Sequence, residues 1–509
     1  MAAVAQEYNF EDKFHCFVGD NATSNDSEFI RGLNTTRFIE LGPQHRIRCA
    51  GHIINLVVKA TIYGSGVSAF EQELSHAAPM DQFKLFRRFG VVGKLHNFVN
   101  AVCASHRRRE LLLTTQREIG AEDPLWNHCT LQLRQDGGVR WHSVYHMLLR
   151  CLELREPIKR FIRRMRSEHL DNNTTTATDA VLADYDPLTD AVTDDDWDEV
   201  AELVQFLEIP FEMTRRLEGS NSISGFGSLW QSLTNLQHLW LSYQAASKQP
   251  RRSEYFSSAV RFGFEKLNTY FERLVMEPDP SFYVVATALH PKLRLTWFKT
   301  HWKDFPRWHA KAEKSIRKVF KQYVDLEVEH ETDEPLPPPR RKQPAASDSA
   351  FEDETMSVDL MLLTGARAFK RAKRVSQLDE YFGDIREDLT NTSMAHEKLL
   401  ADPWLWWLQI GRTRYPVIFK MARDYLTIPS TSCDCERAFS RARRTITSDR
   451  NALSCSTVEA LQLQKDWLNR GVVQSELADL QDFLADPGTT VQKDHEEDQS
   501  TESQDSSAS

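Results

Sequence analysis

The sequence predicts an α/β segment joined to a larger all-α protein, and three observations support this fold class. Two short segments, 15–20 and 44–49, are candidate β-strands, and a helical pattern follows each of them. From about residue 80 to residue 275, apolar residues recur at the spacing of amphipathic helices. Near the C-terminus, residues 396–480 are dense in Trp, Tyr, Phe and Leu, which predicts a well-packed region.

The N-terminal elements follow from polar caps and apolar runs. The first strand ends at Asp20, and residues 25–40 are predicted to form a helix that is capped by the Asn-Asp pair at its start. The second strand, residues 44–49, leads into a predicted helix at 52–62. The apolar residues of that helix are Ile53, Ile54, Leu56, Val57 and Val58.

The helical part contains several segments with clear periodicity. Residues 95–113 and 141–166 both have helical spacing, and the second segment ends in a basic run. Residues 197–218 continue the pattern, with Pro210 as a predicted kink. Further helices are predicted at 226–245 and 253–275.

Two segments have the composition of a linker or a disordered chain. Residues 329–356 are rich in proline and charge and poor in apolar residues, and the acidic tail at 481–509 is similarly polar. The predicted organisation, in chain order, is a partial α/β domain at 1–65, a helical domain at 66–328, a linker at 329–356, a connecting helical segment at 357–395, a packed C-terminal region at 396–480 and a tail at 481–509.

Composition excludes several classes of protein. Hydrophobic residues make up 41% and charged residues 27% of the 509 residues, as in a soluble chain with a sizeable core. No apolar run is expected to cross a bilayer and the N-terminus lacks signal-peptide features, so no membrane partner is expected. Eight cysteines without a CxxC pair predict free thiols and argue against a zinc finger.

The net charge of −10 is unevenly distributed. Residues 184–199 carry eight acidic and no basic residues, residues 325–356 carry ten acidic and three basic residues, and residues 486–509 carry seven acidic residues and one basic residue. These segments account for −21, which leaves the rest of the chain at +11. A basic remainder is compatible with nucleic-acid binding; the alternative is that the acidic segments are simply solvated.

Four separated stretches carry a resemblance to a known family. The longest, Asp402 to Leu468, contains a Trp-Trp pair, Tyr-Pro, ARDYL, Ile-Pro and then ERAFS. The others are GDNATSND at 19–26, RCAGHIINL at 48–56 and VRWHSVYHMLLR at 139–150. In this order they resemble the hAT superfamily of cut-and-paste DNA transposases, and the longest stretch is similar to the dimerisation region of that family.

The resemblance implies a ribonuclease-H-like fold that is interrupted by a large helical insertion. Such enzymes hold two Mg²⁺ or Mn²⁺ ions between an Asp on the first strand, an Asp that ends the fourth strand and a Glu on a late helix. Asp20 and Glu436 match the second and third positions, so both are predicted to be catalytic and metal-binding. From the residues alone, the alternatives are a turn residue for Asp20 and a surface pair with Arg437 for Glu436.

The first Asp of the family has no counterpart in the sequence. Nineteen residues precede Asp20 and fit the end of a helix plus the fourth strand, so the first three strands are expected to be missing. The expected consequences are a partial ribonuclease-H-like domain with an unpaired sheet edge, weak metal binding and impaired catalysis. The BED-type zinc finger of the family is not found either, so sequence-specific recognition of DNA ends is not expected.

DNA contacts are expected away from the metal ions. The resemblance implies that Trp141 stacks on a flipped base; the alternative is a Trp packed beneath the helical domain. Arg140 could meet a phosphate or pair with an acid. The basic run from 159 to 164 could neutralise phosphates, or it could be a solvated helix face beside acidic residues. The candidate residues of this run are Lys159, Arg160, Arg163 and Arg164.

Cys49 and His52 lie in the CxxH motif of the family, where His52 is expected to approach DNA or to orient the site. A zinc site would need two further ligands, for which Cys16 and His45 are the weak candidates, so zinc is not expected. The resemblance also implies self-association as a dimer or a higher oligomer. The candidate aromatic residues for that contact are Trp406, Trp407, Tyr415, Phe439 and Trp467.

The favoured hypothesis is therefore a nuclear, hAT-transposase-derived protein that binds DNA and itself and is catalytically impaired. One alternative is an active Mg²⁺- or Mn²⁺-dependent transposase whose sequence is truncated at the N-terminus. The other alternative is a non-enzymatic dimerisation module, which would need no cofactor.

Overall fold

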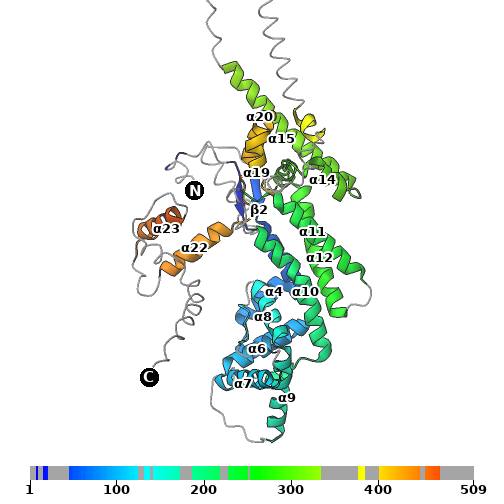
Figure 1. The fold of residues 1–509 in the computed structure, drawn as a ribbon, viewed down its shortest axis with the longest axis vertical. Coiled ribbons are helices and arrows are strands. Elements are labelled where there is room, and N and C mark those ends of the chain that lie inside the picture. The colour runs from blue at the N-terminus through cyan, green and yellow to red at the C-terminus, as the bar shows by residue number, and fades with distance from the viewer. Residues whose placement is uncertain are drawn as a thin grey trace, which may run out of the picture. The chain divides into compact units, whose positions relative to one another are not determined.

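A computed structural model of the chain shows a mainly helical protein with two short strands (Figure 1). It describes Glu7, Asn9, Trp126 and residues 15–20, 45–123, 131–137, 141–171, 186–217, 227–249, 253–333, 377–383, 401–446 and 453–469. The chain divides into two compact units, Met1–Thr431 and Ser432–Ser509, which are treated separately. The boundary lies inside the predicted 396–480 region, so that region contributes to both units.

The strands of the first unit are β1, Phe17–Gly19, and β2, Arg46–Arg48. Its helices up to the acidic segment are α3 Ala50–Tyr63, η3 Gly64–Gly66, α4 Val67–His76, α5 Pro79–Arg87, α6 Gly90–Ala104, α7 His106–Glu122, α8 Trp141–Glu153, α9 Arg155–Asp171 and η4 Pro187–Asp190. The later helices are α10 Asp194–Leu217, α11 Trp230–Lys248, α12 Glu254–Val275, α13 Phe282–Ala288, α14 Arg294–His301, α15 Pro306–Asp333, α19 Pro403–Trp406, η5 Trp407–Gly411, α20 Arg412–Arg414 and α21 Pro416–Leu426. The second unit contains α22 Cys433–Thr445 and α23 Cys455–Asn469.

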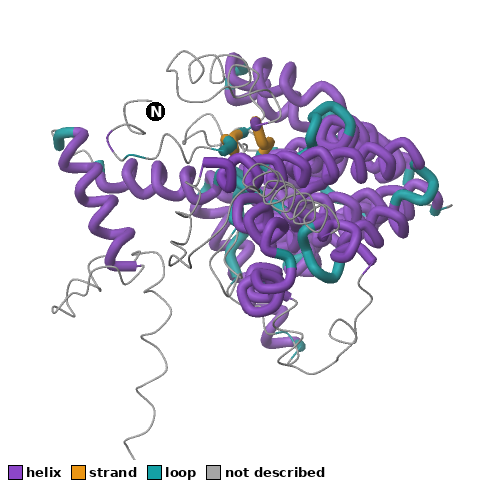
Figure 2. The backbone as a smooth tube through the Cα atoms, turned by 90° about the horizontal axis from the view of Figure 1, so that it is seen from above, coloured by secondary structure: helices purple, strands orange, loops and turns teal. Residues whose placement is uncertain are grey.

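The two predicted strands are confirmed and form a parallel two-stranded sheet, seen among the helices in Figure 2. The register pairs Phe17 with Arg46 and Gly19 with Arg48. The predicted helix at 52–62 corresponds to α3, whereas the predicted helix at 25–40 lies outside the described residues. The model therefore supports a largely helical fold with an α/β element at its start.

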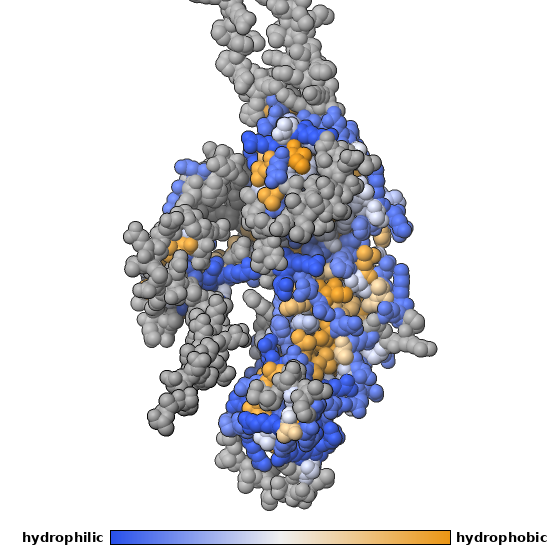
Figure 3. Space-filling view, in the orientation of Figure 1, coloured by the Kyte–Doolittle hydropathy of each residue, from blue (hydrophilic) through white to orange (hydrophobic). Residues whose placement is uncertain are grey.

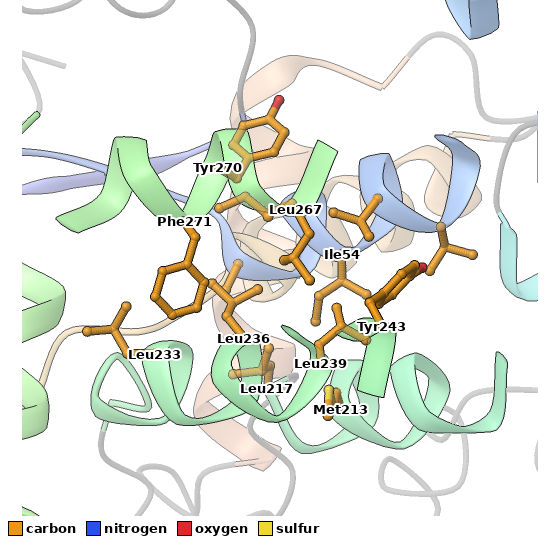
Figure 4. Packing of buried hydrophobic residues seen from close by; sticks show 14 of the residues in the cluster. Ile54, Met213, Leu217, Leu233, Leu236, Leu239, Tyr243, Leu267, Tyr270 and Phe271 are labelled. Atoms are coloured by element: carbon orange, nitrogen blue, oxygen red, sulfur yellow. The ribbon is translucent and has the colours of Figure 1, made fainter. Parts of the chain in front are cut away.

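The core of the first unit lies where α3, α10, α11 and α12 meet (Figure 4). Ile54 of α3 packs among side chains of the other three helices, including Leu239 and Leu267. A Cβ atom on Gly263 would lie 2.1 Å from Thr61 Oγ1, so α3 and α12 can approach this closely only because residue 263 is glycine. The adjacent Thr61 and Tyr243 hydroxyls are 2.6 Å apart and satisfy each other inside the core.

One expectation about membranes needs correction. The stretch Ala50–His76, which contains α3, η3 and α4, is long and apolar enough to cross a bilayer by length and composition. It passes this test because the three helical elements follow each other directly and carry few charges. The apolar side chains of α3, such as Ile53 and Val57, are fully buried against other helices of the unit, as in a core helix.

α10 confirms the predicted helix and contains Pro210 in its interior, where Thr214 donates a hydrogen bond to the Pro210 carbonyl. One helix extends beyond its predicted course. α15 continues to Asp333, so its last turn lies within the segment predicted as a linker. Seven cysteines of the described chain are free thiols, as predicted.

Candidate functional site

The candidate site is built at the carboxyl end of β1, where Asp20 follows the strand. The Cys49 N–H donates to the Gly19 carbonyl at 2.8 Å, which extends the strand pairing to the start of α3. Arg46, 9% exposed, lies beside this end and donates to the carbonyls of Gly19 and Ile47 at 3.2 and 2.8 Å and to that of Asp20. A buried guanidinium thus fixes the backbone that carries Asp20.

Tyr283 covers the outer edge of β2. Its hydroxyl accepts from the Arg48 N–H and donates to the Arg48 carbonyl, both at 2.7 Å. Burial raises the pKa of Tyr283, so the hydroxyl stays protonated and remains able to donate. The hydroxyl therefore replaces the hydrogen bonds of a neighbouring strand at that edge.

The start of α3 is joined to a segment far along the chain. The Ala50 N–H donates to the Ser430 carbonyl at 2.9 Å, and a Cβ atom on Gly51 would lie 3.4 Å from Thr431 Cγ2. The buried Ser430 hydroxyl bonds with that of Ser228 at 2.7 Å and donates to the Leu217 carbonyl at 3.1 Å. Ser430 thus ties together the strand end, the end of α10 and the start of α11.

Cys49 and His52 occupy the first turn of this helix. Cys49 is buried and precedes α3 as its N-cap residue, and His52 is half-buried in the first turn. Their positions place the predicted CxxH motif beside the strand end that carries Asp20. Contact with DNA by either residue stays a prediction.

Asp20 and Glu436 lie in different compact units, and the structure does not fix how these units are placed relative to one another. Glu436 is exposed on α22 and accepts a hydrogen bond from the Ser432 hydroxyl at 3.2 Å. Within the described ranges, three or more His, Cys, Asp or Glu side chains nowhere group as metal ligands. Whether Asp20 and Glu436 share Mg²⁺ or Mn²⁺ ions therefore stays a prediction.

Trp141 opens α8 and is only 1% exposed. Its ring lies 4.2 Å from the His142 ring and is packed edge-on against Phe211 of α10. Base stacking by Trp141 is therefore incompatible with this arrangement, and the alternative of a Trp packed within the helical domain describes it correctly. The indole is buried because Trp141 lies on the apolar face of the amphipathic helix α8, which points into the helical domain. Arg140 lies outside the described residues.

The basic run on α9 is largely paired with acidic residues. Arg160 forms two hydrogen bonds with Glu122 at 2.7 and 2.8 Å, and Arg164 reaches Glu118 at 3.1 Å. Lys159 pairs with Asp194 at the start of α10. The Arg160 side chain lowers the pKa of Glu122, which keeps the acid ionised. The exposed Arg163 donates only to the Lys159 carbonyl, at 3.4 Å.

The acidic segment 184–199 is not simply solvated where the structure describes it. Asp190, 1% exposed, accepts from Arg87 at 2.7 Å and from Asn97 at 2.8 Å. Asp196 accepts from Lys94 at 2.8 Å and from the Thr193 backbone. These carboxylates anchor η4 and the start of α10 to α5 and α6, because buried charges require paired donors.

The predicted dimerisation residues fall into two groups. Trp406, Trp407 and Tyr415 are buried in the first unit, at 2%, 0% and 0% exposure, so they belong to a core and not to a subunit surface. Their predicted role in a dimer contact is therefore corrected. They are buried because they pack against Tyr381 and the connection between α13 and α14. Phe439 and Trp467 of the second unit are 75% and 46% exposed.

The second unit consists of α22 packed against α23, with a hydrogen bond from Gln462 to Thr445 at 3.1 Å. Its surface is polar along α22 and apolar over part of α23 (Figure 3). Large hydrophobic side chains are unusually exposed for so small a unit. They are Phe439, Ile446, Leu461, Leu463 and Trp467, here called the hairpin patch.

Three residues of the site were missed by the sequence analysis, namely Arg46, Tyr283 and Ser430. The only available signal was an arginine inside a short buried strand, since such an arginine needs carbonyl or acidic partners. Tyr283 and Ser430 lie more than two hundred residues from their partners, so no local pattern marks them.

Comparison with known proteins covers most of the chain. The model of the hAT family C-terminal dimerisation region matches residues 378–468, and the model of the ZBED1 RNase-like helical domain matches residues 47–206. A putative AC transposase from Zea mays is 22% identical over 92% of this chain and 50% of its own length. The zinc finger BED domain-containing protein DAYSLEEPER from Arabidopsis thaliana is 23% identical over 66% of this chain and 41% of its own length.

A putative transcriptional regulator, tpeD, from Talaromyces stipitatus is 20% identical over 91% of this chain and 47% of its own length. The chain thus spans about half the length of the curated relatives that it matches. The matched models agree with the order of motifs in the sequence and cover both compact units. The chain therefore contains an hAT family C-terminal dimerisation region and a ZBED1-type RNase-like helical domain, and it is similar to AC transposases and to zinc finger BED domain-containing proteins.

Proposed function

We propose that this chain is an hAT-transposase-derived protein that associates with itself and binds DNA in the nucleus. The observation that carries the proposal is the hairpin patch, which exposes large apolar side chains within the matched dimerisation region. Exposed apolar patches rimmed by polar residues are typical of protein interfaces. The DNA-binding part draws on the relatives, of which two are putative AC transposases.

The described part of the second unit leaves apolar side chains exposed. α22 packs against α23, and Phe439 and Trp467 remain 75% and 46% exposed. A second copy of the same hairpin would cover both rings, since a two-fold interface places the same patch on both subunits. Aromatic anchors of this kind contribute most of the energy of protein interfaces.

Self-association can be tested by sedimentation of the full chain at micromolar concentration. The double substitution Phe439→Ser and Trp467→Ser should raise the dissociation constant at least about 30-fold, as expected for loss of an interface hot spot. The matched control replaces Met80 and Leu241, which are exposed apolar residues of the first unit, with Ser. A monomeric wild-type chain, or equal effects of the two double variants, would contradict the proposal.

DNA binding can be tested by fluorescence anisotropy with duplex and hairpin DNA over a series of salt concentrations. Binding that weakens steeply with salt is the expected result, because phosphate contacts release counterions. A chain that associates with itself but binds no DNA at low salt would instead be the non-enzymatic dimerisation module. Nuclear accumulation of a fluorescent fusion is the expected result for localisation.

A metal-dependent DNA transposase is the second candidate, favoured by the placement of Asp20. The carboxyl end of two parallel strands is where a ribonuclease-H-like sheet carries acidic ligands, and Arg46 holds the backbone there. Carboxylates suit Mg²⁺ or Mn²⁺, but two of them are fewer than the three that such a site needs. When bound, the ions would activate the attacking oxygen of a phosphodiester reaction, and Asp20 and Glu436 would hold them.

This candidate predicts two readouts for the variants Asp20→Asn and Glu436→Gln. Each should weaken Mn²⁺ binding about tenfold, measured by electron paramagnetic resonance, and abolish Mg²⁺-dependent strand cleavage. Asp304→Asn, at an exposed acid on another surface, serves as the control. Unchanged Mn²⁺ binding in both variants would remove these carboxylates from any metal site.

A further inference from the structure

α15 carries a row of five basic residues along one face. The spacing of four, three, four and three residues keeps their side chains within roughly an 80° arc of an α-helix. From the first to the last, the row is about 21 Å long at 1.5 Å per residue. The residues are Arg307, Lys311, Lys314, Lys318 and Lys321, here called the α15 row.

The opposite face of α15 holds the row in place. Ala312, Ile316, Val319 and Val324 are buried, and the helix packs against α13 and α21. All members of the row are exposed except Lys311, which is half-buried. The row is therefore presented to solvent by a helix that is anchored in the core of the first unit.

Among the described residues, the ion pairs of the row are formed with one acid, and a second acid, Asp325, follows Lys321 by one turn on the same helix face. Asp279, in the connection between α12 and α13, lies 3.5 Å from the Lys311 ammonium and 3.1 Å from that of Lys318. The hydrogen bond from Lys318 is the main cause that lowers the pKa of Asp279, so the acid is ionised. Arg307, Lys314 and Lys321 form no hydrogen bond or ion pair with any part of the chain that the structure describes.

The basic run of α9 provides a contrast. There, Arg160 and Arg164 are bonded to acids of α7, and Lys159 to an acid of α10. Neutral ion pairs contribute little to the attraction of a polyanion, whereas uncompensated cations in a row create a sustained positive field. Three cations of the α9 run are thus paired with acids, whereas three cations of the α15 row are not paired within the described chain.

We propose that the α15 row binds the phosphate backbone of duplex DNA. The row matches the length of about six phosphates of one strand, which are spaced about 3.4 Å apart along the helix axis. A membrane surface is a poorer match, because a membrane-bound helix inserts an apolar face and that of α15 is buried. The inference deepens the proposed function, since it names the surface that contacts DNA, and it rests on that function.

The test compares two triple variants of equal charge loss in the full chain. Arg307→Gln, Lys314→Gln and Lys321→Gln together should weaken duplex binding at least about tenfold and lower the salt slope by about 2.7, at about 0.9 per phosphate contact. The control replaces the paired cations Lys159, Arg160 and Arg164 with Gln and should change affinity less than about threefold. The α15 variant changes exposed residues, whereas Lys159 and Arg160 of the control are half-buried, so thermal unfolding checks that each variant folds.

A third variant, Lys314→Arg with Lys321→Arg, keeps the charges and should retain wild-type affinity. If wild-type protein binds DNA and the α15 triple variant binds equally well with the same slope, the inference is wrong while the proposed function stands. If wild-type protein binds no DNA at low salt, both are wrong. Polyglutamate and unlabelled DNA of equal charge are also compared as competitors of the labelled duplex. If polyglutamate competes as well as the DNA does, the row is a site for acidic polypeptides and the inference is also overturned.

Discussion

The two parts of the matched C-terminal region use their aromatic residues in opposite ways. Between α19 and α21, Trp406, Trp407 and Tyr415 are sealed in the core of the first unit. In α22 and α23, Phe439 and Trp467 remain exposed. One family motif thus contains both a structural half and a surface half, and residue type alone does not separate them.

The buried half is specified by partners from elsewhere in the chain. The Trp407 indole donates to the Leu289 carbonyl at 2.8 Å, and its ring lies 5.3 Å from that of Tyr381. The side chains of the hairpin patch, by contrast, remain 38–75% exposed. The difference predicts that substitutions in the first half reduce stability and that substitutions in the second half reduce association.

The largest effect is expected for Trp407→Ala. Removing a fully buried indole leaves a cavity and an unpaired carbonyl at Leu289, so the free energy of unfolding should fall by about 3–5 kcal/mol. Denaturant unfolding followed by circular dichroism measures this change. Trp467→Ala is the matched control and should change stability by less than about 0.5 kcal/mol. Equal losses in the two variants would remove the distinction between the halves.

A smaller effect is expected for Gly411→Ala. The added Cβ would lie 2.2 Å from Trp407 Cε3, so the ring must shift, and overpacking of this kind costs about 1–3 kcal/mol. Gly66→Ala is the control, because a Cβ there meets nothing within 4 Å. Thermal unfolding of both variants gives the comparison, and a Gly411→Ala protein as stable as the control would show that the indole has room to move.

Mild acid should also weaken the buried half. Burial, followed by the charge of Lys292, lowers the pKa of His290 to about 3 from an ordinary value near 6.5. As the pH falls below 6.5, His290 is protonated in the unfolded chain but stays neutral in the folded chain. The free energy of unfolding therefore decreases by about 1.4 kcal/mol at pH 5.5. Asn in place of His290 retains an acceptor for the Lys292 N–H. The variant should therefore lose less stability than the wild-type protein between pH 7 and pH 5.5, as measured by denaturant unfolding at each pH. If the free energy of unfolding falls equally with pH in both proteins, His290 is not the cause.

The smallest effect on stability is expected for Ile446→Ser, at the end of α22. The side chain is 45% exposed, so the free energy of unfolding should change by less than about 0.5 kcal/mol. The dissociation constant for self-association should nevertheless rise several-fold, because the residue belongs to the hairpin patch. Light scattering over a concentration series measures the association. A large loss of stability with unchanged association would reverse the roles of the two halves.

Much of the fold was predictable because it depends on local patterns. The strands that became β1 and β2, the helix that became α3 and the order of the helical segments all follow from periodicity and caps. The motif order also predicted the family, which the matched models confirm. The placement of Asp20 at a strand end is likewise a local feature, set by the length of β1.

Long-range pairing decided the rest. The cations of α9 and α15 look alike in the sequence, yet Glu118, Glu122 and Asp194 pair with α9 from other helices, whereas the α15 row forms ion pairs with Asp279 through two of its five members. Trp141 and Trp407 likewise became core residues because distant segments closed over them. Periodicity determined which residues share a helix face, since that depends on neighbours three and four positions away. Only the tertiary structure decided which faces are buried, paired or left open, because burial and charge compensation depend on contacts between segments far apart in the chain.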